Sequence, residues 1–382
     1  MYSITINKQL LSLNKKSISS RADNPTNKPI LPSNTGLNDV INAAPTSANS
    51  VVVPCELSKS EISIPGFICK GQLIFEDNFN FNLDENKLWT SEIMFPGHPD
   101  YPFNIYEKKA RVEDGKLFIN PITLESDYGL DFVRRSLDLR DRCTGTMSNS
   151  ECYREAFGPQ ILPPAITAKV TTKRTFSFKY GRIEVGAKMP VGDWLIPLIQ
   201  LEPRDKIYGS LNYASGLIRI ACVKGNIEYS KRLYGGVILS ELNPYRSAYL
   251  REKVGNEQWN RLFHNYSVLW SPNEISVYVD GEKYGEVTPG QGFFEEARKY
   301  NVTAATNWLK GTLLAPLDEM FYVSLGLDVG GIHEFPDSPN KPWKNASNKA
   351  MLEFWNAHDK WYPSWRKEES ALVIDYVRIY AL

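Results

Sequence analysis

Residues 176–194, FSFKYGRIEVGAKMPVGDW, contain the pattern that decides the fold. Apolar side chains recur at every second position in this stretch, at Phe176, Phe178, Ile183, Val185 and Ala187. A period of two is typical of a β-strand that buries one of its faces. We therefore expect β-strands across this stretch, with their apolar faces turned toward a common core.

The same alternation extends through most of the chain on both sides. It predicts strands over residues 72–76, 110–112, 116–119, 166–170, 267–270, 275–279 and 372–380. Glu113-Asp-Gly115 is a hairpin turn signal between two of them. Helical spacing of apolar residues occurs only over 245–254 and 349–361. Many short strands and few helices predict an all-β protein of the β-sandwich or jelly-roll type.

The N-terminal residues differ in composition from the rest. One aromatic residue, Tyr2, precedes Phe67, and the first fifty residues are rich in Ser, Asn, Lys, Thr and Pro. Such a segment buries too little apolar surface to offset the entropy lost on ordering. We expect residues 1–50 to be a disordered tail or linker and residues 51–382 to form one β-sandwich domain.

Composition excludes several classes of function. Lys and Arg number 44, and Asp and Glu also number 44, so the chain lacks the basic surplus of nucleic-acid-binding proteins. The sequence has no run of ~18 apolar residues, so it predicts no membrane-spanning helix. We find no phosphate-binding Gly loop, zinc-spaced Cys/His set or Ser-His-Asp arrangement, and we expect no cofactor and no metal.

A series of segments, in a fixed order, carries a resemblance to a known family. These segments are residues 69–79, 142–145, 152–156, 161–164, 176–194, 212–222, 263–272, 277–281, 328–331, 341–343 and 374–380. At these residues the sequence resembles the laminarinase-like branch of the family-16 glycoside hydrolases. It is more closely similar to the insect β-1,3-glucan recognition proteins, also called Gram-negative bacteria-binding proteins. The resemblance covers about residues 52–382 and implies a concanavalin A-like, laminarinase-type jelly roll.

One strand decides what the resemblance implies for function. Active relatives carry Glu-x-Asp-x-x-Glu after Ala-Ser-Gly, because a retaining glycosidase needs two carboxyl groups ~5–5.5 Å apart. The two-residue period puts the first two acids on one face of the strand, and a bulge returns the third to that face. After Ala214-Ser-Gly216 this chain has Leu217, Arg219 and Cys222 instead. We therefore predict no catalytic residue and no enzyme activity.

The resemblance then implies a receptor rather than an enzyme. The predicted function is recognition of microbial cell-wall polysaccharide in innate immunity, with β-1,3-glucan as the first ligand and lipopolysaccharide as a further candidate. Components of a serine protease cascade are the partners that the resemblance implies. A second hypothesis is an active β-1,3-glucan hydrolase that uses a displaced carboxylate, such as Glu202 or Glu228. A third is a scaffold that binds only protein.

Aromatic side chains are candidates for a sugar-binding groove, since sugar rings stack on Trp and Tyr. Their alternative role is packing in the core or at the rim of the sandwich. For His264 we expect a hydrogen-bonded structural role. By position, the candidate ligand-binding residues are Trp194, Tyr208, Asn212, Trp308 and Trp343.

The cysteines and sequons bear on the compartment. The resemblance implies disulfides Cys55–Cys69 and Cys143–Cys152, which would leave Cys222 as a free thiol. Five reduced thiols in a cytosolic protein are the alternative. Sequons at Asn301 and Asn345 are the predicted glycosylation sites, whereas Asn265 lies in an expected strand. We predict a secreted, extracellular protein, although no signal peptide is visible in this sequence.

Overall fold

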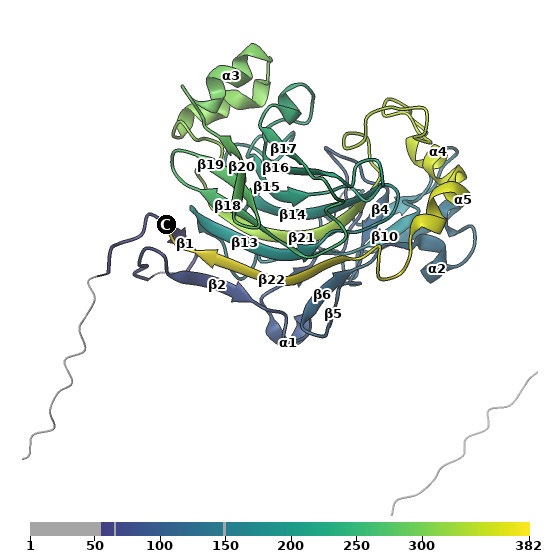
Figure 1. Cartoon of the computed structure of the whole chain (residues 1–382). Helices are drawn as coiled ribbons and strands as arrows, with labels where there is room; N and C mark the ends of the chain where they lie inside the picture. Colours follow the sequence, from purple (N-terminus) through teal and green to yellow (C-terminus); the bar gives the residue numbers. More distant parts are fainter. Residues whose placement is uncertain (1–54, 65, 148–149) are drawn as a thin grey trace, which may run out of the picture. The chain divides into compact units, whose positions relative to one another are not determined.

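Two large antiparallel β-sheets stack face to face in the computed structural model, which describes residues 55–64, 66–147 and 150–382 (Figure 1). This arrangement confirms the predicted all-β sandwich. The predicted disordered tail, residues 1–50, lies outside the described residues.

One sheet has nine strands among the described residues, and it carries the candidate site. Its strand β15 contains Leu217, Arg219 and Cys222, the three positions that the sequence singles out. The hydrogen-bonded order is β1 (Glu61–Ile62), β12 (Phe178–Lys179), β21 (Phe321–Val329), β14 (Leu195–Pro203), β15 (Leu217–Cys222), β16 (Arg232–Ile238) and β17 (Leu250–Val254). Beside β12, β21 also pairs with β11 (Lys169–Thr171), which in turn pairs with β3 (Thr90–Ser91).

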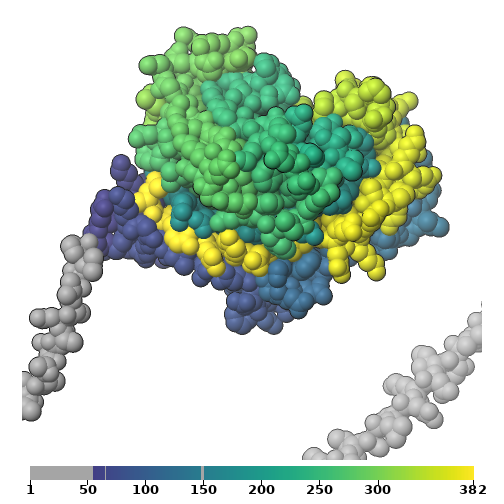
Figure 2. All heavy atoms as spheres, in the orientation of Figure 1, coloured from purple at the N-terminus to yellow at the C-terminus, as the bar shows by residue number. Residues whose placement is uncertain are grey.

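The facing sheet has eight strands within the described part of the chain. The order is β20 (Glu282–Val287), β19 (Ile275–Val279), β18 (His264–Trp270), β13 (Gly181–Lys188), β22 (Leu372–Tyr380), β6 (Lys116–Ile119) and β5 (Arg111–Glu113), with β2 (Leu73–Asp77) also paired to β22. Figure 2 shows the first described residues (purple) against the C-terminal segment (yellow), as this last pairing requires.

The core lies between the two sheets. Ile183 and Val185, which belong to the alternating segment 176–194, are fully buried on β13. Trp270 packs edge-on, with ring centroids 5.5 Å from Phe178 and 5.3 Å from Phe321. The alternating residues therefore face the core, as their spacing predicts.

Smaller elements surround the sandwich. Helix α4 (Ala350–Asn356) packs beside a small sheet of three strands, because Leu352 and Trp355 contact the apolar cluster that contains Ile105 and Ile166 of that sheet. The remaining strands are β4 (Asn104–Tyr106), β7 (Ile122–Thr123), β8 (Ser136–Asp138), β9 (Tyr153–Glu155) and β10 (Ala165–Thr167). The α-helices are α1 (Leu83–Asn86), α2 (Leu124–Tyr128), α3 (Phe293–Lys299), α4 (Ala350–Asn356) and α5 (His358–Trp361). The 3-10 helices are η1 (Phe132–Arg134), η2 (Tyr245–Ser247), η3 (Thr303–Lys310) and η4 (Tyr362–Ser364).

Local predictions had mixed outcomes. The turn between β5 and β6 forms as expected, with positive φ at Asp114 and Gly115, as a type I′ turn requires. The helix predicted over 349–361 is present as α4 and α5. The helix predicted over 245–254 is wrong: a 3-10 turn leads into β17 there, because pairing with β16 at the sheet edge outweighs a short helical spacing.

Candidate functional site

An open cleft of about 820 Å³ lies on the outer face of the nine-stranded sheet. Loop residues 94–102, 144–146 and 203–216 contribute its walls. Side chains of both charges line it together with hydroxyls, which suits hydrogen bonding to a polar ligand. The sheet residues that line the cleft are Thr90, Ser91, Lys169, Thr171, Ile196, Leu198, Gln200, Glu202, Leu217, Arg219, Tyr322 and Asp328.

Strand β15 brings two of the three positions predicted to replace catalytic acids into this cleft. Leu217 and Arg219 are two residues apart and both line it. The predicted bulge is present, since the register against β16 shifts between Arg219 and Cys222. Cys222 is fully buried and does not line the cleft. Burial raises the pKa of this thiol, the one free cysteine within the described residues.

Around Arg219 the cleft floor contains a cluster of ions, which we call the ion cage: Arg219, Lys224, Arg246, Glu334 and Asp100. The Glu334 carboxylate lies 2.9 Å from an Arg219 nitrogen, 2.8 Å from an Arg246 nitrogen and 3.7 Å from Lys224 Nζ. Asp100 lies 3.0 Å from Arg246. The two arginines are about 95% buried and the glutamate is about 90% buried, so the pairing takes place at low dielectric.

The electrostatics of the ion cage fix the state of its central carboxylate. Burial alone would raise the pKa of Glu334, but the charges of Arg219 and Arg246 outweigh burial and hold it well below the usual range. A glycosidase acid must hold a proton at working pH, and a nucleophile must be free to attack. Glu334 does neither, because it stays ionised and its oxygens are occupied by cations.

A second polar cluster, of residues from β11, β14 and β21, also lines the cleft. Lys169 Nζ binds Glu202 at 2.9 Å and Glu92 at 3.2 Å. Burial would raise the pKa of Glu202, but the Lys169 ammonium lowers it to about 2. Asp328 accepts a 2.5 Å hydrogen bond from the Tyr106 hydroxyl, and burial raises its pKa to about 7. This cluster therefore combines Glu202, which is ionised at neutral pH, with Asp328, which titrates near neutrality.

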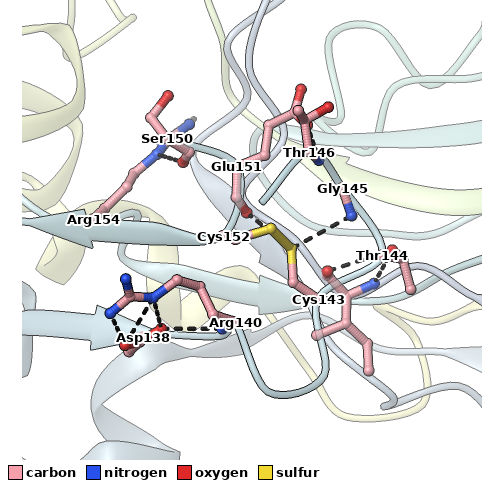
Figure 3. The surroundings of a disulfide bond; sticks show 11 residues. Asp138, Arg140, Cys143, Thr144, Gly145, Thr146, Ser150, Glu151, Cys152 and Arg154 are labelled. Carbon is pink, nitrogen blue, oxygen red and sulfur yellow. Dashed lines mark hydrogen bonds and ion pairs between the residues drawn. A yellow bond between two sulfur atoms is a disulfide. The ribbon is translucent and has the colours of Figure 1, made fainter. Parts of the chain in front are cut away.

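A disulfide holds one wall of the cleft (Figure 3). Both predicted disulfides, Cys55–Cys69 and Cys143–Cys152, are formed. The backbone amide of Thr146 donates to a Glu151 carboxylate oxygen at 2.7 Å, which closes the loop beside the second disulfide. Because Thr144, Gly145 and Thr146 line the cleft, this cross-link sets the position of the wall.

The aromatic residues predicted to bind ligand are not brought together in the cleft. Trp194, Tyr208, Trp308 and Trp343 are buried, each 5% exposed or less, and none of them lines it. Their polar atoms bind the protein instead: Trp308 Nε1 donates to the Ala214 carbonyl at 2.6 Å, and Trp343 Nε1 donates to the Gly331 carbonyl at 2.9 Å. With no ring face free, these side chains position the cleft loops, and stacking on sugar stays a prediction.

Asn212 is half-buried in the loop before β15, with positive φ, and does not line the cleft. The exposed Glu228 also lies outside the lining. His264 binds Asp280 at 2.7 Å, as its predicted structural role requires.

The two sequons differ in their surroundings. Asn301 is exposed. The Asn345 amide donates to the Phe335 carbonyl at 2.9 Å and accepts from the buried Lys341. Glycosylation at either site stays a prediction.

Sequence reasoning missed most of the ion cage and, of the two acidic partners of Lys169, it named only Glu202 and in another role. Glu334 lies in an irregular loop and Arg246 in the 3-10 helix η2, and no local pattern links them to Arg219. The available signal was Arg219 itself, a cation at a strand position whose neighbours are buried, which requires an anion from elsewhere in the chain. Within the described residues no group of three or more His, Cys, Asp or Glu is placed to hold a metal ion, and no helix is long and apolar enough to cross a membrane.

Known proteins are similar to this chain in sequence, and others are similar in fold. The family model for glycosyl hydrolases family 16 matches residues 241–314. The chain is 61% identical to beta-1,3-glucan-binding protein 1 of Galleria mellonella over 345 residues, which cover 90% of this chain and 70% of that protein. It is 40% identical to Gram-negative bacteria-binding protein 1 of Drosophila melanogaster over 350 residues, with 86% and 68% covered.

Among solved structures, the endo-beta-1,3-glucanase of Pyrococcus furiosus matches with a TM-score of 0.53. The match covers 81% of this chain and 94% of that one at 20% identity. This likeness is one of fold, and it confirms the predicted laminarinase-type jelly roll.

Proposed function

Because the chain belongs to the family of β-1,3-glucan-binding and Gram-negative bacteria-binding proteins, we propose that it is a pattern-recognition protein without glycosidase activity. Its ligand would be microbial cell-wall polysaccharide, in the first place β-1,3-glucan, and its role would lie in innate immunity. The two relatives are named for binding glucan and Gram-negative bacteria respectively.

The observation that carries this proposal is the ion cage around Arg219 of β15. We infer that Leu217, Arg219 and Cys222 occupy the positions of the glycosidase carboxylates, and that Arg219 has turned the catalytic floor into a structural ion pair with Glu334. A fixed guanidinium here would oppose the positive charge of an oxocarbenium-like transition state. Without a nucleophile, the cleft retains the capacity to bind while most of the rate enhancement is lost.

The remaining lining suits a neutral sugar. Hydroxyl groups can donate to carboxylates such as Glu202 and accept from the ammonium of Lys169, and both residues lie in the cleft. Charge-assisted hydrogen bonds of this kind are about twice as strong as neutral ones. In this proposal polar groups on the sheet bind β-1,3-glucan by hydrogen bonds, and stacking on indole rings is not required.

Compartment and partners are further parts of the proposal. Two disulfides in the described structure favour an oxidising compartment, so we infer secretion. A receptor without catalysis needs a partner to signal, and components of a serine protease cascade are the partners proposed from the family resemblance.

No observation favours the alternative of an active hydrolase. Lys169 holds Glu202 ionised in a buried pair, and Glu228 is exposed outside the cleft lining. Neither of these two candidates is therefore placed to act as a displaced nucleophile or acid.

Co-sedimentation with an insoluble β-1,3-glucan tests the proposal. We expect the wild-type protein to pellet with the glucan, and the double variant Lys169→Met with Glu202→Gln to bind about tenfold more weakly, because it loses charge-assisted bonds to sugar. Replacing Glu202 together with Lys169 avoids leaving the Glu202 carboxylate buried without its cation, and Glu92 is the one partner that loses its ion pair. Glu252→Gln, which breaks a more exposed pair with Arg232 outside the cleft lining, is the matched control. Absence of wild-type binding would refute the proposal and favour the protein-binding scaffold.

A further inference from the structure

Segments from opposite ends of the strands meet above β15 and β16. Leu217 is paired with Ile238, so the segment 239–246 that follows β16 lies at the same end of the sheet as the start of β15. Leu195 is paired with Val329, and Phe103 N donates to the Val329 carbonyl at 2.7 Å. Residues 96–102 and 330–334 therefore start from the other end.

Side-chain contacts join these segments across the face of the sheet. We call the six residues involved the bridge: His98, Asp100 and Glu334 from one end, and Tyr213, Glu241 and Arg246 from the other. His98 Nε2 lies 2.7 Å from Glu241, and Arg246 lies 2.8 Å from Glu334. Asp100 accepts from the Tyr213 hydroxyl and forms an ion pair with Arg246 at 3.0 Å, whose angle is too bent for a hydrogen bond.

The bridge coincides with the boundary of the cleft. Strands β3, β11, β21, β14 and β15 contribute lining residues, whereas within the described residues β16 and β17 contribute none. The Arg219 side chain beneath the bridge is 5% exposed. Because buried charges would lose their partners if the bridge opened, it is a stable wall.

A second side of the cleft is also closed. Strand β4 lies across the end of β21, where the buried Tyr106 binds the partly buried Asp328. In contrast, Lys173, Arg174, Lys206 and Ser210 are exposed lining residues at the opposite end of the strands. The cleft therefore opens beside these four residues and is closed on the two sides that the bridge and β4 form.

From this geometry we infer that the cleft accepts the end of a glucan chain, or a short branch, and excludes the interior of a chain. A chain that crossed the sheet would have to pass through the bridge over β15 and β16. This inference rests on the proposed function, because it assumes that the cleft binds β-glucan, and it specifies the part of the polymer that is recognised.

Isothermal titration with two forms of one ligand tests the inference. The probes are a cyclic β-1,3-linked glucan, which has no chain ends, and the same glucan after a single cut. We expect the cut form to bind and the cyclic form to bind at least tenfold more weakly. A double variant, His98→Ala with Asp100→Asn, should gain affinity for the cyclic form because it removes two contacts of the bridge. Asp84→Asn, which breaks an exposed pair with Lys108, should not.

The possible results separate the two claims. Equal affinity of the wild-type protein for both forms would overturn the inference of end recognition and leave the proposed function standing. Failure of both forms to bind would refute the proposed function and the inference with it. The wild-type comparison needs no variant, so it holds even if the double variant does not fold.

Discussion

Substitution Glu334→Gln removes the anion at the centre of the ion cage. It leaves the buried cations beside β15 without this counter-ion. In the folded protein this carboxylate contacts guanidinium groups of Arg219 and Arg246 at 2.9 and 2.8 Å. After the substitution Asp100 still faces Arg246, but Arg219 and Lys224 keep no counter-ion in the cage.

The expected cost follows from burial. At an effective dielectric constant of ~20, a pair of unit charges ~4 Å apart gains about 4 kcal/mol before desolvation is counted. Removing one member of a buried pair leaves the other charge desolvated and typically costs about 3–5 kcal/mol. We therefore expect Glu334→Gln to lower the free energy of unfolding by about 3–5 kcal/mol, a large share of the ~5–15 kcal/mol of a typical domain.

Urea unfolding followed by tryptophan fluorescence measures this loss. The double variant Arg219→Met with Glu334→Met should be more stable than Glu334→Gln, because it removes a cation together with the anion. Glu252→Gln, in a more exposed pair, should change the unfolding free energy by less than about 1 kcal/mol. A loss below about 1 kcal/mol for Glu334→Gln would refute the view that the cage is structural.

Three further results are expected. The folded protein keeps the Asp328 proton up to a pH of about 7, whereas the unfolded chain releases it near 4, so the free energy of unfolding should fall as pH rises through this window. Measured by unfolding titrations and relative to Asp328→Asn, the fall should approach ~4 kcal/mol. Parallel pH profiles for the wild-type protein and this variant would contradict the prediction. Cys143→Ser with Cys152→Ser should cost about 2–3 kcal/mol in urea unfolding and weaken glucan binding, since the disulfide holds a cleft wall, and unchanged binding would argue against that role. Lys169→Met alone should raise the pKa of Glu202, which then faces a second carboxylate without a cation; carboxylate NMR titration would show it, and a pKa that stays near 2 would contradict it.

The regular part of the fold could be predicted from the sequence, because a period of two reports directly on a half-buried strand. The final strand was predicted over residues 372–380 and occupies those residues. The hairpin at Asp114-Gly115 and the bulge in β15 also followed from local rules. Residues 245–254 failed because their fate depends on pairing with β16, which no local spacing encodes.

The candidate site was predicted only in part, for a similar reason. Leu217, Arg219 and Cys222 could be singled out from the sequence, because they lie on one strand, and the replacement of acids there stays a prediction. The partner Glu334 is 115 residues from Arg219 and comes from an irregular loop, so it required the structure. Aromatic content indicated a protein rich in Trp and Tyr, but it does not distinguish Trp308 in the core from an indole in a cleft.

The most direct test of the central claim measures binding and hydrolysis of laminarin in the same sample. Titration calorimetry reports binding, and a reducing-end assay over many hours reports cleavage of the same glucan. We expect saturable binding of laminarin, with no more reducing ends than in a protein-free control. Reducing ends that accumulate with time, and that disappear in Glu202→Gln, would contradict it.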